Sequence, residues 1–469
     1  MVGACYLLMT ACHIAGGAVA PGVVGAESVP DLDVRSGLRF AVGMMFSPRF
    51  LLALCAMAGT LHGAQWPSWR GPNQDGTTPD TGFPVKWDKS TNVRWRTELP
   101  ELGNSSPVVW GGTVFITQAL EDGKERTVMA FDRKTGKLLW QRGVRYDAKD
   151  PRHQTNPHCA ASPVTDGDCV VASFASAGVV AYDFSGKELW KADLGKQVHG
   201  WGQGSSPVLH GDQVIVYHGP GEFSSLVALD KRTGAVRWRV PLQEQHPPER
   251  WDGFAGKNDG MIGTFSTPLL VRTAGREEVV LPVVNQLKAF DPKTGSVLWF
   301  AEGINPLVYS SPTLGQETLV VFGGFFGSGM FIRPGGAGDR TSERLFYERR
   351  LKKHTIGSPI VKDGYIYQSS TDGFGQCFEL ATGKLVWEER LPSTGASGQT
   401  WSSMVRSGDL LYVVNQSGDT LVLKASPKYE LVSTNPIGEV SNSPLALSGG
   451  EVFLRTQSAL YCIAEARKP

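Results

Sequence analysis

The sequence predicts an all-β fold, a closed eight-bladed β-propeller of four-stranded antiparallel blades. Three observations predict it: a Ser-Pro or Thr-Pro dipeptide recurs at a nearly constant interval, a turn ending in tryptophan recurs between these dipeptides, and the 469 residues include 56 glycines and 13 tryptophans. Glycine allows tight turns, and tryptophan fits pleated, half-buried surfaces. The composition therefore favours a turn-dense β protein over a helical one.

The first half of the repeat is the dipeptide with the short apolar strand that follows it. From Pro107 to Pro444 the chain advances 337 residues in seven steps, about 48 per step, which is near the length of a four-stranded propeller blade. The eight starts are Ser106, Ser162, Ser206, Thr267, Ser311, Ser358, Ser403 and Ser443, with methionine in place of proline after Ser403.

The second half is a turn followed by a strand that ends in tryptophan, as in Asp132-Arg-Lys-Thr-Gly-Lys-Leu-Leu-Trp140. The aspartate can accept hydrogen bonds from the turn amides, and the glycine supplies a positive φ. We therefore expect the aspartates to be structural and the tryptophans to pack one blade against the next. The tryptophans of this set are Trp95, Trp140, Trp190, Trp238, Trp299 and Trp387.

Three blades depart from the pattern. The 88 residues between Trp299 and Trp387 are nearly twice the usual interval, which predicts a hidden blade that starts at Ser311 and ends near 344–349. A seventh blade is expected from Trp401 to about Thr434. The eighth lacks a fourth strand after 461–464, and we expect 93–96 to supply it, because a blade shared between the two ends closes the ring and removes exposed sheet edges.

The regions outside the propeller, which spans 93–464, are predicted separately. Residues 1–64 are interpreted as a signal or targeting region with translation starting at Met44 or Met45, and a single N-terminal anchor is the alternative. Residues 65–92 are expected to form an irregular strap, and 465–469 a tail. We expect an exported protein, periplasmic or extracellular, that is monomeric and has no transmembrane domain in its mature chain. The net charge of +1 argues against a nucleic-acid partner.

The Ala-x-Asp-x-x-Thr-Gly-x-x-x-Trp units resemble the tryptophan-docking repeats of the pyrroloquinoline-quinone (PQQ) propeller family over 93–464. This resemblance implies the fold and leaves two activities open. One is that of the quinoprotein alcohol dehydrogenases, and the other is that of the non-catalytic scaffold of outer-membrane-protein assembly. The chain resembles the scaffold type more closely. The dehydrogenases hold PQQ beside a disulfide between adjacent cysteines, with a Glu/Asn/Asp set that binds calcium next to a catalytic aspartate. Fold alone cannot decide between these activities.

The chain lacks the features that the dehydrogenase reading implies. It has no Cys-Cys pair, and we expect Cys159, Cys169, Cys377 and Cys462 to be buried free thiols. Asp252, Asn258 and Asp259 carry ligand oxygens for calcium, but they lie in one insertion and are interpreted as a solvated loop. No catalytic residue and no metal site are therefore predicted, and PQQ with calcium is not supported as a cofactor.

A candidate ligand site lies where the segments before the innermost strands border the central channel. Polar and aromatic side chains that converge on one mouth form a typical ligand site, and an insertion at 243–260 is a candidate lid. The alternative is that these side chains only bind neighbouring blades and channel water. The candidate residues are Asn104, His158, Gln203, Thr264, Tyr309, His354, Trp401 and Asn442.

The leading prediction is a binding or scaffold propeller that holds a protein or small-molecule ligand at this mouth. The rival is a PQQ-dependent oxidoreductase acting on alcohols or aldose sugars. A third hypothesis is a carbohydrate-active or ligand-sensing propeller.

Overall fold

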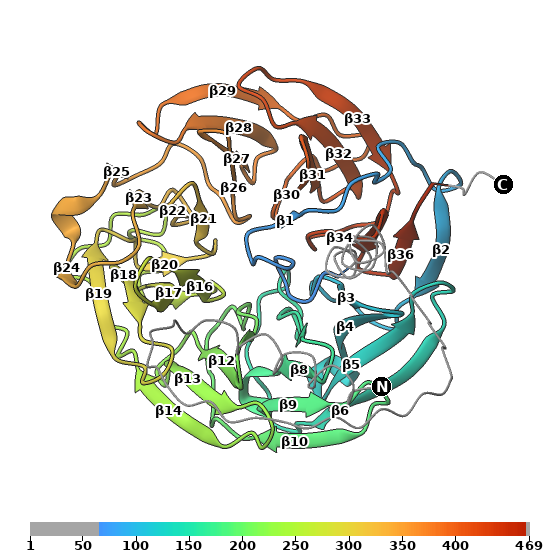
Figure 1. Ribbon diagram of the computed structural model, residues 1–469, viewed down its shortest axis with the longest axis horizontal. Coiled ribbons are helices and arrows are strands. Elements are labelled where there is room, and N and C mark those ends of the chain that lie inside the picture. Colours follow the sequence, from blue (N-terminus) through green and yellow to red (C-terminus); the bar gives the residue numbers. More distant parts are fainter. Residues whose placement is uncertain (1–64, 466–469) are drawn as a thin grey trace, which may run out of the picture. The chain divides into compact units, whose positions relative to one another are not determined.

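The computed structural model describes residues 65–465, which form eight four-stranded antiparallel sheets arranged as a ring around a central channel (Figure 1). The predicted all-β, eight-bladed fold is confirmed. The expectations for 1–64 and for most of the tail fall outside the described residues. Within residues 65–465 no helix is long and apolar enough to cross a membrane.

The strands follow one another outwards from the channel in each blade. The first four blades are β3 (Val108–Trp110), β4 (Thr113–Leu120), β5 (Glu125–Asp132) and β6 (Leu138–Arg145); β7 (Val164–Thr165), β8 (Val170–Ser173), β9 (Val179–Tyr182) and β10 (Glu188–Ala192); β11 (Val208–His210), β12 (Gln213–His218), β13 (Ser225–Asp230) and β14 (Val236–Pro241); and β16 (Leu269–Arg272), β17 (Glu277–Val283), β18 (Gln286–Phe290) and β19 (Val297–Glu302).

The next three blades are β21 (Thr313–Gly315), β22 (Thr318–Phe322), β23 (Gly329–Ile332) and β25 (Phe346–Glu348); β26 (Ile360–Lys362), β27 (Tyr365–Ser369), β28 (Phe374–Glu379) and β29 (Leu385–Arg390); and β30 (Val405–Ser407), β31 (Leu410–Val414), β32 (Asp419–Lys424) and β33 (Leu431–Pro436). Blade eight is β34 (Ala446–Ser448), β35 (Glu451–Arg455), β36 (Ala459–Ile463) and β2 (Val93–Glu98). The additional elements are β1 (Thr77–Thr78), β15 (Gly263–Thr264), β20 (Leu307–Val308), β24 (Gly338–Asp339), and the 3-10 turns η1 (Glu121–Gly123), η2 (Ala175–Ala177) and η3 (Thr341–Glu343).

The ring closes through the predicted strand near the N-terminal end of the propeller. β2 pairs antiparallel with β36, so that Trp95 faces Cys462 and Glu98 faces Ala459. The hidden blade also lies where the 88-residue interval predicted it, with β25 as its outer strand. On the way to β25, the chain adds β24 as an extra parallel strand on the outer edge of blade four, beside β19.

Five of the six repeat tryptophans dock on the turn of the following blade. Trp140 Nε1 donates to the Phe184 carbonyl at 2.9 Å. The turn's Gly186 lies so close to this ring that a Cβ added there would come within 2.8 Å of it, at a φ of +85° that already favours glycine. Trp95, Trp190 and Trp238 repeat both contacts, and Trp387 repeats the hydrogen bond.

Blade five breaks this series at both of its ends. In blade five the chain passes through β24 instead of forming the repeat turn. Trp299 of blade four therefore has no turn to dock on, and its Nε1 donates to Glu278 of blade four at 2.8 Å, while Arg340 covers the ring. Its outer strand has no tryptophan, and Phe346 takes the place under Gly383 of blade six. The ring contact is therefore kept where the sequence signature is lost.

The Ser-Pro repeat has a structural reason on the inner rim of the ring. Ser106 N donates to Ser162 Oγ at 2.8 Å, and Ser162 N donates in turn to Ser206 Oγ at 2.9 Å. The chain of bonds continues through Thr267, Ser311, Ser358 and Ser403. A hydroxyl at this position thus satisfies a buried amide of the preceding blade, and buried amides are rarely left unpaired.

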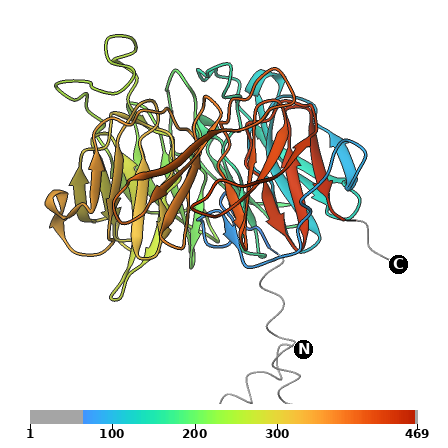
Figure 2. The same ribbon diagram turned by 90° about the horizontal axis from the view of Figure 1, so that it is seen from above.

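Residues 65–92 begin on the propeller axis. Trp66 pairs with Val109 of blade one, and β1 adds in parallel to β30 of blade seven. Between them the buried Arg70 guanidinium donates to the carbonyls of Ser358, Pro359 and Met404 at 2.7–3.2 Å. This segment, blue in Figures 1 and 2, therefore fills the channel near one face of the ring.

Candidate functional site

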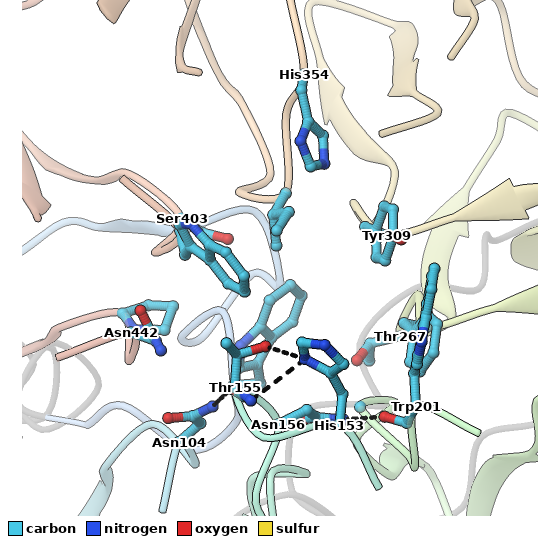
Figure 3. Close-up of a pocket in the computed structure, with 16 residues that line it drawn as sticks. Asn104, His153, Thr155, Asn156, Trp201, Thr267, Tyr309, His354, Ser403 and Asn442 are labelled. Atoms are coloured by element: carbon cyan, nitrogen blue, oxygen red, sulfur yellow. Dashed lines mark hydrogen bonds between the residues drawn. The ribbon is translucent and has the colours of Figure 1, made fainter. Parts of the chain in front are cut away.

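A cavity of about 260 Å³ lies on the axis beside this plug (Figure 3). Trp69 of the N-terminal segment borders it, and the other lining residues come from the loops that lead into the inner strands. Among the described residues that line the cavity, none is Asp, Glu, Lys or Arg. The site is therefore concave, rich in aromatic rings, and free of carboxylate and ammonium groups.

Five of the eight candidate residues line the cavity: Asn104, Tyr309, His354, Trp401 and Asn442. The structure places the other three elsewhere. Gln203 Nε2 donates to Ser173 Oγ at 3.1 Å, and Thr264 is fully buried in β15. His158 packs against Gly123 of η1, and burial there lowers its pKa to about 4.

A single position of the repeat explains most of the difference between the candidates that line the cavity and those that do not. The residue two before the Ser or Thr of the dipeptide faces the cavity in six blades, at Asn104, Gly204, Phe265, Tyr309, Ile356 and Trp401. Gln203 and Thr264 stand three before, and successive side chains of an extended segment point to opposite sides. The prediction was wrong by one residue in these two blades, and alignment on the dipeptide would have corrected it.

Thr267, Ser403 and Pro444 line the cavity from the dipeptide positions themselves, whereas the lining residues of two loops carry no repeat signal. His153, Thr155 and Asn156 belong to the loop after blade one, and Trp201 precedes blade three. Asn156 Nδ2 donates to the Trp201 carbonyl at 2.8 Å, which joins the two loops, and His153 Nδ1 lies 2.7 Å from Thr155 Oγ1 (Figure 3). Trp69 reaches the site through the path of the N-terminal segment, which no local pattern indicates.

Three aromatic side chains form a wall on one side of the cavity. The rings of Phe265 and Tyr309 are nearly parallel, at 9° with centroids 5.6 Å apart, and those of Trp201 and Tyr309 lie at 16° and 6.4 Å. Burial, with a smaller effect of the Asp252 charge, raises the pKa of Tyr309 well above its ordinary value. The wall is therefore uncharged at neutral pH, and below we call it the aromatic wall.

Three polar atoms of the lining lack partners, and one of them belongs to His354, whose ring lies beside Tyr309 with centroids 6.0 Å apart. Asn104 Oδ1, His354 Nε2 and Trp401 Nε1 are buried and make no hydrogen bond within the described residues. Asn104 is held by its other amide atom, which donates to the Thr155 carbonyl at 3.0 Å. Burial lowers the pKa of His354 to about 4, so its imidazole is neutral at pH 7. Buried polar groups normally have a partner, and unpaired ones at a cavity mark places for a ligand or water.

The insertion at 243–260 packs beside the mouth, and the yellow-green loop of Figure 2 rises from the face opposite the plug. Phe254 contacts Trp201, with ring centroids 5.0 Å apart, and Phe325 at 4.3 Å. Asp252, expected in a solvated loop, is 1% exposed, and both of its carboxylate oxygens accept from Arg250 at 2.7 and 3.0 Å. The insertion is thus anchored by a buried ion pair, which leaves Asp252 no free oxygen for calcium.

The four cysteines of the described chain are free and buried, as expected. Burial raises the pKa of Cys159 to about 12, so this thiol stays protonated and is a poor nucleophile and metal ligand. Within residues 65–465 no group of three His, Cys, Asp or Glu side chains is arranged to hold a metal ion.

The sequence matches the family model described as "Outer membrane protein assembly factor BamB" over residues 79–196, 177–373 and 285–468. Among curated proteins, the tetrathionate hydrolase of Acidithiobacillus ferrooxidans is 23% identical over 329 residues, 70% of this chain and 53% of that protein. The outer membrane protein assembly factor BamB of Burkholderia pseudomallei is 23% identical over 299 residues, 60% of this chain and 64% of that protein. The matched region thus spans half to two thirds of the length of these relatives.

Solved structures of low sequence identity share the fold. BamB from Moraxella catarrhalis superposes with a TM-score of 0.55 at 15% identity, covering 79% of this chain and 99% of that one. A europium-containing methanol dehydrogenase gives 0.62 at 13% identity, covering 86% and 98%. The quinohemoprotein alcohol dehydrogenase of Comamonas testosteroni gives 0.57 at 14% identity, covering 88% and 83%. Scaffold proteins and dehydrogenases are both represented, so these likenesses establish the fold alone.

Proposed function

This chain belongs to the PQQ-repeat family described as outer membrane protein assembly factor BamB, and on that premise we propose that it is an exported binding or scaffold propeller. Its ligand or partner is held at the mouth of the central channel. The observation that carries this proposal is the cavity on the axis, where side chains from most blades converge and three buried polar atoms have no partner. Convergent polar groups in an aromatic cavity are the usual form of a ligand site.

The alternative activity in this superfamily needs PQQ and a hard metal ion such as calcium, and the cavity residues do not fit them. PQQ is a tricarboxylate, so burying it requires cations, and calcium requires hard oxygen ligands, several of them carboxylates. The lining offers no Arg or Lys for the first and no Asp or Glu for the second. The nearby Asp252 carboxylate is already engaged by Arg250. We therefore derive no redox step for this site.

The two functions are separated by titrating the purified full chain with PQQ and Ca²⁺ and assaying dye reduction with alcohols and aldose sugars. We expect neither saturable PQQ binding nor turnover. Saturable binding accompanied by substrate-dependent dye reduction would replace the binding proposal with the dehydrogenase one.

Occupation of the mouth is tested with a variant that fills the cavity. Gly204 faces the cavity, and a Cβ there would meet Phe265 only at an ordinary 3.5 Å, so Gly204→Leu can project into the space without strain. Gly112, which has open space around it in an exposed hairpin, provides the matched control Gly112→Leu.

The readout is crosslinking in the producing cell from a photoreactive residue at Gln154, an exposed position beside the mouth, compared with Lys191 on the outer strand β10. We expect an adduct at position 154 that is lost in Gly204→Leu and kept in Gly112→Leu. Equal adducts at 154 and 191, unchanged by Gly204→Leu, contradict a site at the mouth.

Export is tested by fractionating cells that express the full chain with a C-terminal tag and by sequencing the N-terminus of the recovered protein. We expect the protein outside the cytoplasm, beginning close to Gln65. A full-length chain recovered from the cytoplasm contradicts this part of the proposal.

A further inference from the structure

We propose that the axial cavity binds one neutral sugar ring, a hexopyranose unit, through the aromatic wall on one side and through three unpaired polar atoms, those of Asn104 and Trp401 facing the wall and that of His354 beside it. This inference rests on the proposed function, because it names the ligand class of the same mouth. Four properties of the cavity carry it: its size, its aromatic wall, its unpaired polar atoms and its lack of charge.

The volume of the cavity is suited to a single ring. Ligand pockets for drug-sized molecules begin at roughly 300 Å³, and this cavity measures about 260 Å³. Trp69 lies against the plug of the channel, so a longer molecule cannot thread through the ring. Only the mouth is left for the rest of a glycan, so a terminal or free sugar fits.

The aromatic wall matches the apolar face of a pyranose. The rings of Phe265, Tyr309 and Trp201 stack nearly parallel and all three line the cavity, so together they border it with an apolar surface. The axial C–H groups of a pyranose form a flat apolar patch of about the area of one aromatic ring, and burying such apolar area is favourable. The wall thus binds the carbon face of the sugar and leaves its hydroxyls directed elsewhere.

The unpaired polar atoms lie where those hydroxyls would point. Asn104 belongs to blade one and Trp401 to blade seven, which stand opposite blades five and three in a ring of eight, and His354 enters from blade six. Figure 3 shows Asn104 across the cavity from Tyr309, and His354 on the side of Tyr309, with the two ring centroids 6.0 Å apart. The indole N–H of Trp401 is a donor, Asn104 Oδ1 is an acceptor, and the neutral imidazole can serve as either.

This number and spread of groups favours a sugar over an aromatic side chain from a partner protein. A phenol or indole carries one polar atom and would leave two of the three groups buried and unpaired, which is unfavourable in the complex. A hexose carries hydroxyls around its whole rim and can meet all three. The ligand is therefore polyhydroxylated.

The ligand is also neutral. No lysine or arginine among the described lining residues can pair with a carboxylate or phosphate, and no acid can pair with an amine. Moving an unpaired charge into such a site is strongly unfavourable. Uronic acids, sugar phosphates and amino sugars with a free amine are thus excluded by the same lining that does not fit PQQ.

The test is calorimetric titration of the full chain at pH 7. The neutral probes are D-glucose, D-galactose, D-mannose and N-acetyl-D-glucosamine. The charged probes are D-glucuronate and glucose 6-phosphate, and the aromatic probe is N-acetyl-L-tyrosinamide. We expect at least one neutral sugar to bind saturably, and both charged probes to bind at least about tenfold more weakly or not at all.

Variants place that binding in the cavity. Trp401→Phe removes the indole donor and should weaken the sugar that binds by about tenfold, whereas Trp110→Phe, outside the cavity on β3, should leave the affinity unchanged. Melting temperatures report whether each variant is folded. If Trp401→Phe does not fold, Gly204→Leu replaces it and should abolish binding, because it occupies the volume of the ring.

The failure of this inference can be distinguished from failure of the proposed function. Binding of the charged probes as tightly as the neutral sugars, binding of the tyrosine amide alone, or no binding by any neutral sugar overturns the sugar assignment. The proposed site survives any of these results if the adduct at position 154 remains sensitive to Gly204→Leu, and it fails if that adduct is insensitive.

Discussion

At the scale of single residues, hydroxyls and imidazoles in the buried parts of the ring have opposite effects on stability. The hydroxyl of Ser162 accepts from the amide of the preceding blade, so it satisfies a group that has no access to water. The imidazole of His218, 1% exposed, has only a long 3.4 Å contact from Nε2 to the Lys196 carbonyl and none at Nδ1. The first stabilises the ring, and the second makes its stability depend on pH.

Ser162→Ala should lower the free energy of unfolding by about 1–3 kcal/mol, because it leaves the buried Ser106 amide without an acceptor. Ser106→Ala is the matched control. Both serines are fully buried and precede proline, but Ser106 Oγ makes no hydrogen bond, so its removal should change stability by less than about 0.5 kcal/mol. Urea unfolding of the two variants measures the difference. Equal losses in the free energy of unfolding contradict a stabilising role of the hydrogen bonds between blades that the Ser and Thr hydroxyls accept.

Acidification from pH 7 to pH 5 should destabilise the protein through its buried histidines. Burial, aided by the Arg239 charge, lowers the pKa of His218 to about 4, below its ordinary value near 6.5. Between these two values the unfolded chain binds a proton that the folded chain does not. The free energy of unfolding therefore decreases as the pH is lowered, by about 2 kcal/mol at pH 5 for this residue. The raised pKa of the buried Glu244 acts in the opposite direction.

His218→Gln should reduce this loss, as measured by urea unfolding at pH 7, 6 and 5. His158, His199 and His354, whose pKa values are also lowered to about 4, should keep part of the slope. The exposed His246→Gln serves as the control and should leave the slope unchanged. An unaltered slope in His218→Gln would show that His218 titrates normally.

At the scale of the element, the outer strands hold neighbouring blades together through one residue each. On β10, Trp190 is 6% exposed and docks on the turn of blade three, while the adjacent Leu189 is 46% exposed and points to solvent. The two residues differ by one position on the same strand. Alternation along the strand therefore separates a structural side chain from a surface one.

Trp190→Ala should cost about 3–5 kcal/mol because it removes a buried ring, whereas Leu189→Ala should cost less than about 1 kcal/mol. Differential scanning calorimetry of both variants measures this, and comparable losses would mean that the docking contact contributes little. Trp299→Ala should be at least as costly as Trp190→Ala, because Trp299 is fully buried and its loss also removes one of the donors to the buried Glu278 carboxylate, which keeps those from Arg276 and Gly335.

At the scale of the whole molecule, the antiparallel pairing of β2 with β36 closes the eight blades into one cooperative ring. Thr97 pairs with Leu460 across this closure, and its hydroxyl donates to the Gly136 carbonyl of blade one at 2.7 Å. The two interactions can be removed separately, because one belongs to the backbone and the other to the side chain.

Thr97→Pro should destabilise the ring by about 3 kcal/mol or more, because proline removes a backbone donor and disturbs the strand. Thr97→Val keeps the backbone and loses only the hydroxyl, at about 1 kcal/mol. Limited proteolysis and thermal unfolding distinguish them. A Thr97→Pro protein that is as stable and as protease-resistant as Thr97→Val would show that ring closure contributes little to stability.

The sequence by itself determined the eight-bladed ring. The repeat dipeptide, the tryptophan turn and the interval between Trp299 and Trp387 were sufficient for the blade count, the hidden blade and the closing strand, because each blade is built from contacts with its immediate neighbours that recur in register. Even Phe346, which carries no signature, lies in the strand that the interval predicted. Contacts that recur from blade to blade leave a periodic pattern in the amino-acid sequence, so they can be recognised without the structure.

Only the tertiary structure decided the cavity. A candidate residue lines the cavity where it stands two residues before the dipeptide, as at Tyr309, and Gln203 and Thr264 do not line it, because a shift of one residue turns a side chain away from the axis. Trp69 and Trp201 enter from segments outside the repeat, and the lack of charge is a property of the whole lining. Side chains that meet at an axis come from positions far apart in the chain, so their combination exists only once the ring has closed.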